Sequence, residues 1–139
     1  ITFEPDENIY RLSHALLNIL LTCLDIKWKK NFPPALLRVT NYIESNYASD
    51  LPNSHLAETA CLSIEGLSRM FRNHLNISPA AFVTRTRIKE SSRLLLETNE
   101  SIDRIASATG FPNRNYFSRV FKKVTNQSPA EFRRLNKKI

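Results

Sequence analysis

Residues 68–82 read SRMFRNHLNISPAAF, and residues 118–132 read SRVFKKVTNQSPAEF. Eight of the fifteen aligned positions are identical at a constant offset of 50 residues. The similarity continues upstream, where Leu56-Ala57 corresponds to Ile105-Ala106 at an offset of 49. Because an internal repeat marks a structural unit that occurs more than once, we expect two copies of one supersecondary element in this chain.

The composition predicts the fold class. The chain has 139 residues, enough for one large domain or for a small domain with an appendage. It contains only two glycines, Gly66 and Gly110, and its apolar residues recur at helical spacing. Long alternating runs of β-branched residues do not occur in the sequence. We therefore predict an all-α protein.

Capping residues divide the second part of the chain into helices. The candidate N-caps are Ser63, Ser78, Ser101, Asn113 and Ser128. Proline follows two of these serines at the first helical position, which is a strong signal for a helix start. The predicted helices cover residues 35–47, 54–60, 64–75, 79–97, 102–109, 114–125 and 129–137. Their candidate buried residues include Leu36, Leu37, Val39, Tyr42, Ile43, Tyr47, Phe82, Ile88, Leu94, Leu95 and Leu96.

Each repeat has the pattern of a helix-turn-helix, at about residues 54–75 and 102–125. In this motif a short helix and a tight turn precede a second helix, which enters the major groove of DNA. Apolar residues on the second helix of each copy are expected to face the core. They are Leu67, Met70 and Phe71 in the first copy and Phe117, Val120 and Phe121 in the second.

The other face of each second helix carries side chains that can read bases. They are Glu65, Ser68, Arg69 and Arg72 in the first copy and Arg114, Asn115, Ser118, Arg119 and Lys122 in the second. Arginine can bind guanine O6 and N7 bidentately, and asparagine can bind adenine N6 and N7 in the same way. The alternative is a charged helix face that meets only solvent.

The predicted helix at 79–97 links the two copies. At roughly 1.5 Å per residue it is about 28 Å long. Successive major-groove segments on one side of DNA are about 34 Å apart. One stiff helix could therefore hold two second helices about one DNA turn apart.

The N-terminal part has a different pattern. Residues 8–30 are predicted to form an amphipathic helix, because apolar residues from Ile9 to Ile26 follow the a/d spacing of a coiled coil. This helix either packs on the rest of the chain or serves as a dimerisation or coupling segment. The stretch KKNFPP at 29–34 ends it. We divide the chain into residues 1–34, the last segment or linker of a longer protein, and residues 35–139.

Charge and cysteine content indicate the environment. Residues 1–34 have no net charge, whereas residues 35–139 carry the whole formal charge of +7. A basic surface attracts phosphate polyanions. Cys23 and Cys61 are too few for a disulfide scaffold, so we expect reduced, buried thiols in a cytoplasmic protein. No stretch reaches the roughly 18 apolar residues of a membrane span.

The sequence offers little for catalysis. His14, His55 and His74 have neither a partner histidine at i+4 nor a cysteine cluster near them, so we expect no metal site. Two isolated glycines cannot form a phosphate-binding loop. We therefore predict no enzyme and no cofactor. The main alternative to DNA binding is a helical module for protein–protein interaction or dimerisation.

Several motifs of residues 35–139 resemble the DNA-binding domain of AraC/XylS-type transcriptional regulators. The most specific stretches are GFPNRNYFSRVFKK at 110–123 and SPAEFR at 128–133, with SIDRIA at 101–106 before them. In the first copy, LSRMF at 67–71 and SP at 78–79 also fit. The resemblance implies two helix-turn-helix units and double-stranded DNA as the partner. It also implies RNA polymerase as a partner, and activation is the family's commoner mode.

Site residues follow from the resemblance by position. It implies base contacts from Glu65, Ser68, Arg69, Arg114, Asn115, Ser118 and Arg119. Arg72, Lys122 and Lys123 lie toward the C-terminal ends of the two helices, where we expect them to contact phosphates. The first copy departs from the second at Cys61, which stands where the second copy has Gly110. If that turn needs a positive φ, cysteine is strained there or the turn differs. Gly66 lies inside the first recognition helix, at a cost of up to ~1 kcal/mol relative to alanine.

Overall fold

A computed structural model describes residues 16, 29 and 31–137 of the chain. Every regular element in this part is a helix, which confirms the all-α prediction. The elements are α2 (Pro34–Asn46), α3 (Asn53–Ala60), α4 (Ile64–Leu75), α5 (Pro79–Glu97), α6 (Ile102–Ala108), α7 (Arg114–Thr125) and α8 (Pro129–Asn136). Each predicted bound agrees with the structure to within one residue. The predicted helix at 8–30 lies outside the described residues, apart from Leu16 and Lys29.

Side-chain caps explain why the helices begin where they do. The Oγ atoms of Ser63 and Ser78 accept hydrogen bonds from the Gly66 and Ala81 amides, at 3.0 and 3.1 Å. Ser101 and Asn113 cap α6 and α7 in the same way, and Ser128 forms a full capping box with α8. Each cap satisfies an otherwise unpaired backbone N–H and contributes about 1 kcal/mol.

The helices form two cores that share α5. The core residues of the first are Leu36, Val39, Ile43, Leu56, Ala57, Ala60, Leu67, Phe71 and Val83. The core residues of the second are Ile88, Leu95, Ile105, Ala106, Phe111, Phe117 and Phe121. Helix α5 supplies Val83 to one and Ile88 and Leu95 to the other. Burial of these apolar surfaces is the main stabilising term in each half.

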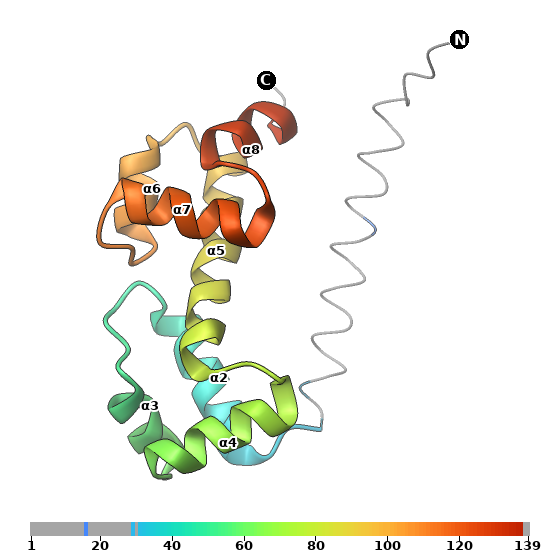
Figure 1. Cartoon of the computed structure of the whole chain (residues 1–139), viewed down its shortest axis with the longest axis vertical. Coiled ribbons are helices and arrows are strands. Elements are labelled where there is room, and N and C mark those ends of the chain that lie inside the picture. The colour runs from blue at the N-terminus through green and yellow to red at the C-terminus, as the bar shows by residue number, and fades with distance from the viewer. Residues whose placement is uncertain (1–15, 17–28, 30, 138–139) are drawn as a thin grey trace.

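Figure 1 shows how the shared helix organises the molecule. Helix α5 runs along the long axis, with α2, α3 and α4 around its lower part and α6, α7 and α8 around its upper part. The second helix of each helix-turn-helix, α4 or α7, lies crosswise to α5 (Figure 1). Both contact α5 directly. The linker predicted from the sequence is therefore also part of each core.

The two turns within the helix-turn-helix units have the same backbone structure. Cys61 has a φ of 56° and Gly110 a φ of 88°. The Cys61 amide donates to the Glu58 carbonyl at 3.0 Å, and the Gly110 amide donates to the Ser107 carbonyl at 3.2 Å. The residue after each also donates five positions back. The turn at Cys61 is thus the same turn, and the cysteine occupies a left-handed conformation that costs about 1–2 kcal/mol.

Several burial predictions were wrong or only partly right, and among these Tyr42 and Tyr47 are only partly buried. Cys61 is exposed rather than buried, because it closes α3 at the surface of the turn. Leu37 is 36% exposed, since α2 buries the face that holds Leu36, Val39 and Ile43. Phe82, Leu94 and Leu96 are only partly buried. The first two of these pack on the edges of the first and second core.

Candidate nucleic-acid interface

Helix α4 separates an apolar face from a polar one. Leu67 and Phe71 are completely buried, and Met70 packs against them at the edge of the core. The remaining face carries Glu65, Ser68, Arg69 and Arg72, of which only Ser68 is partly buried. The structure therefore brings the predicted reading residues of the first copy together on the outer face of one helix.

Helix α7 repeats this division. Phe117 and Phe121 are completely buried, and Val120 packs at the edge of the core. The predicted reading residues Arg114, Asn115 and Arg119 are exposed, and Ser118 is partly buried. Lys122 and Lys123 are exposed in the last turn of the helix. Cations in the last turn also interact favourably with the helix dipole.

Arg114 is held by an acidic residue of the preceding helix. Its Nη1 lies 3.3 Å from Oδ2 of Asp103 in α6, and both side chains are more than half exposed. An exposed pair of this kind contributes only about 0–1 kcal/mol. The contact therefore orients Arg114 at the start of α7 but leaves it able to exchange partners. Spacing in the sequence did not reveal this pair, because the two residues lie on different helices.

Arg119 lies against an aromatic ring that the sequence analysis did not select. Its guanidinium carbon is 5.9 Å from the centre of the Tyr116 ring. Tyr116 is 44% exposed, and its ring packs against the ring of Phe111, with 6.3 Å between the ring centres. A cation over an exposed aromatic face gains about 0.5–1 kcal/mol. Tyr116 thus favours the conformation of Arg119 in which the guanidinium lies over the Tyr116 ring.

The first copy lacks this aromatic support. Gly66 stands at the position that Tyr116 holds in the second copy, 50 residues later. A Cβ at Gly66 would lie 3.2 Å from the Ser63 Oγ that caps the helix and 3.6 Å from the Leu62 Cβ. The absence of a side chain therefore leaves room for the cap. Arg69 consequently has no aromatic ring one turn before it on α4.

The two polar faces belong to a repeated fold whose sequence can be compared with known proteins. A family described as "Helix-turn-helix domain" matches residues 56–135, more than half of the chain. The chain belongs to the AraC-type helix-turn-helix family. The match includes both copies of the motif and the linker helix α5.

Individual proteins agree with this assignment. The arabinose operon regulatory protein of Escherichia coli K12 is 40% identical over 124 residues, covering 86% of this chain and 42% of that protein. The solved C-terminal domain of AraT, a response regulator from Geobacillus stearothermophilus, has a TM-score of 0.75 and 33% identity, covering 78% and 91% of the two chains. A Chromobacterium violaceum regulator with an AraC-type DNA-binding domain has a TM-score of 0.71 at 27% identity, covering 74% and 92%. The chain spans about half the length of the curated relatives it matches.

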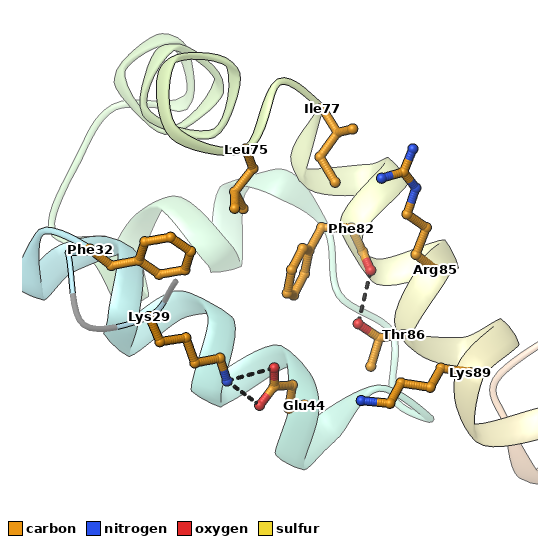
Figure 2. Close-up of a pocket in the computed structure, with 9 residues that line it drawn as sticks. All are labelled: Lys29, Phe32, Glu44, Leu75, Ile77, Phe82, Arg85, Thr86 and Lys89. Atoms are coloured by element: carbon orange, nitrogen blue, oxygen red, sulfur yellow. Dashed lines mark hydrogen bonds and ion pairs between the residues drawn. The ribbon is translucent and has the colours of Figure 1, made fainter. Parts of the chain in front are cut away.

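A cavity of about 270 Å³ lies on one side of the first half of this AraC-type domain. Figure 2 shows its lining side chains: Lys29, Phe32, Glu44, Leu75, Ile77, Phe82, Arg85, Thr86 and Lys89. The Lys29 ammonium crosses one wall to the Glu44 carboxylate at 2.8 Å. The volume is below the roughly 300–1,000 Å³ of typical ligand pockets. The outward reading residues of α4 do not line it.

Other parts of the AraC-type domain carry charges away from the reading faces. On α5, Arg93 lies 3.0 Å from Glu90 and 2.8 Å from Glu97. Hydrogen bonds to Glu90 and Glu97 raise the pKa of Arg93 above its ordinary value. Among the described residues there is no group of three or more histidine, cysteine or acidic side chains that could hold a metal ion. Within that same part of the chain, no helix is both long and apolar enough to cross a bilayer.

Proposed function

We propose that this chain binds double-stranded DNA in a sequence-specific manner and thereby regulates transcription. Helices α4 and α7 would enter successive segments of the major groove along one side of the duplex. Two helices pack crosswise on one shared helix (Figure 1), and each carries a polar outer face. This repeated arrangement is the observation that carries the proposal. The names of the similar proteins, which are transcriptional regulators, support it.

Base reading would divide between the two helices. Arg119 and Arg114 are suited to guanine, and Asn115 is suited to adenine. In α4, Arg69 would read guanine, and Glu65 would accept from cytosine N4. Ser68 and Ser118, which are partly buried, can reach a base only at close approach of the helix. The second copy has more basic reading residues, so we assign it the larger share of specificity.

Phosphate contacts would supply most of the salt-dependent affinity. Arg72, Lys122 and Lys123 are exposed near the C-terminal ends of α4 and α7. Each phosphate that a cationic side chain neutralises releases counterions, so binding weakens as the salt concentration rises. The surplus of positive charge on residues 35–139 supports this assignment.

Relatives named as transcriptional activators, such as RhaS, support activation through contact with RNA polymerase. The a/d pattern of residues 8–30 supports self-association as a homodimer. DNA as the partner supports a cytoplasmic location. Residues 1–34 would then connect the DNA-binding part at 35–139 to the rest of a longer regulator.

Selection of bound sequences from random duplex DNA tests the proposal. We expect two short motifs with centres about one helical turn, or 10 base pairs, apart. The double variant Arg69→Ala with Arg119→Ala should lose the preference at one base pair of each motif. Recovery of no enriched sequence by the parent chain would contradict the proposal. Binding of a protein partner that hardly responds to salt would instead favour a helical interaction module.

A further inference from the structure

Three distant segments meet at Arg87, in the middle of α5. Arg87 lies between Val83, which belongs to the first core, and Ile88, which belongs to the second. Its Nε donates to the Tyr47 carbonyl at 2.7 Å, and its Nη2 donates to the Ser49 carbonyl at 2.8 Å. Both carbonyls belong to the loop between α2 and α3. The linker helix is therefore bonded to the first half through a side chain as well as through its apolar face.

The second half reaches the same point through its turn. A Cβ added to Gly110 would lie 2.9 Å from the Arg87 Nε and 3.0 Å from the carbonyl oxygens of Tyr47 and Ala48. Contacts of this length leave no space for a side chain. The backbone of the turn before α7 therefore packs directly on the Arg87 guanidinium and on the first half. Glycine suits this position for two reasons. It has no side chain, and it readily adopts the left-handed φ of 88° found here.

The charges around Arg87 suit a fixed guanidinium. Tyr47 closes α2, so its carbonyl lies at the negative end of that helix. Burial lowers the pKa of Arg87, while Asp50 of the first half and Tyr116 of α7 act in the opposite direction. Arginine remains charged under these conditions. At neutral pH the Tyr116 phenol is uncharged, so the charge that favours the guanidinium is the Asp50 carboxylate of the first half.

We propose that Arg87 is a positioning residue that fixes the orientation of α7 relative to α4. One helix connecting two bodies can bend and twist, whereas a second contact away from its axis opposes both motions. In this structure the second contact is the junction of Arg87, the Tyr47–Ser49 loop and Gly110. Under the proposed function, on which this inference rests, the junction sets the spacing of the two DNA motifs that one chain binds together.

The orientation can be measured without DNA. Residual dipolar couplings of the backbone amides in the full chain should fit one alignment tensor across both halves. In Arg87→Ala, we expect the two halves to require different tensors. Arg93→Ala is the control, because among the described residues the ion pairs of Arg93 are with Glu90 and Glu97 of the same helix. Tensors that stay equal in Arg87→Ala would overturn the inference.

The consequence for DNA is tested with duplexes that hold one selected motif, both motifs, or both with one added base pair. Arg87→Ala should bind each single motif like the parent. It should lose about ten-fold or more on the two-motif duplex, because the second contact no longer gains from a fixed geometry. It should also discriminate less against the added base pair. Equal loss on single motifs, or an unchanged spacing preference, would contradict a positioning role.

Arg87→Lys provides the conservative variant and replaces Arg87→Ala if that protein does not fold. Lysine keeps the charge but donates from a single nitrogen. We expect its spacing preference to be weaker than that of the parent, and a preference equal to the parent's would argue against a role for the two carbonyl contacts. If the parent binds no duplex, the proposed function fails, while the dipolar couplings still decide the role of Arg87 in the free protein.

Discussion

Arg87 and Lys137 lie 50 residues apart and make corresponding contacts. Arg87 donates to the carbonyl of Tyr47, the residue that closes α2, and the Lys137 ammonium donates to the carbonyl of Thr98, which closes α5. Lys137 also donates to Oδ1 of Asn99. Helices α2 and α5 are the first helices of the two halves. The duplication therefore includes a cation at the negative end of the first helix of each half, Arg87 from within α5 and Lys137 from the residue that follows α8.

The left-handed turn at Cys61 predicts a stabilising substitution. Cys61→Gly should raise the free energy of unfolding by about 1 kcal/mol, because relief of the left-handed strain exceeds the extra entropy of glycine in the unfolded chain. Urea denaturation measures the change. Cys61→Ala is the matched control, since it removes the thiol and keeps the strain. An equal gain in both variants would show that the thiol, and not the backbone, is responsible.

Arg119 is the strongest candidate for base reading in α7. Arg119→Ala should weaken binding to the selected duplex by about 1–3 kcal/mol and relax the preference at one base pair. Binding titrations on the selected site and on its single-base variants measure both effects. Arg93→Ala, on the linker helix, should leave them unchanged. Equal affinity of Arg119→Ala and the parent would refute the assignment.

Tyr116 should act through Arg119. Tyr116→Leu removes the ring beneath the guanidinium and should weaken specific binding by about 0.5–1 kcal/mol. In the background of Arg119→Ala the same substitution should have little further effect, because the supported side chain is gone. A complete double-mutant cycle on the selected duplex measures this coupling. Additive losses would mean that Tyr116 acts independently of Arg119.

Lys122 should contribute to affinity and not to sequence preference. Lys122→Ala should weaken binding to all duplexes by a similar factor and reduce the slope of log affinity against log salt concentration by about 1. Titrations at several salt concentrations, on specific and random duplexes, test this. A loss confined to the selected sequence would assign Lys122 to base reading instead.

The aromatic core of the second half predicts a stability effect without DNA. Phe121 is completely buried, with its ring centre 5.6 Å from Phe117 and 5.4 Å from Phe132. Phe121→Ala should lower the free energy of unfolding by about 3–5 kcal/mol, as measured in urea. Val124→Ala is a control on the same helix, because Val124 is 47% exposed. A similar loss in both variants would argue against this core.

The sequence was sufficient to predict the helices, because the residues that start them act locally. Ser63, Ser78, Ser101 and Asn113 each cap the helix predicted for them. A cap bonds an amide only a few residues away, so its effect is visible in a short window. The resemblance to AraC-type regulators, carried by residues 110–123, is likewise a matter of contiguous sequence, and the family match confirms it.

Contacts between distant residues were not predictable in this way. The pairing of Arg114 with Asp103 and the hydrogen bonds from Arg87 to the loop after α2 depend on how the helices pack. The exposure of Cys61 also depends on that packing, and a general preference of cysteine for the interior gave the wrong prediction. The reading residues remain a prediction for which the structure supplies exposure and a common face.

The double role of α5 restricts how this protein can diverge. Val83 and Ile88 are only five positions apart, yet they belong to different cores. One residue inserted between them would turn everything beyond it by about 100° and displace it by about 1.5 Å. Val83 and Ile88 could then no longer both pack in their own cores. Natural variants should therefore differ by substitution at the surfaces of the two halves, and length changes within this helix should be selected against.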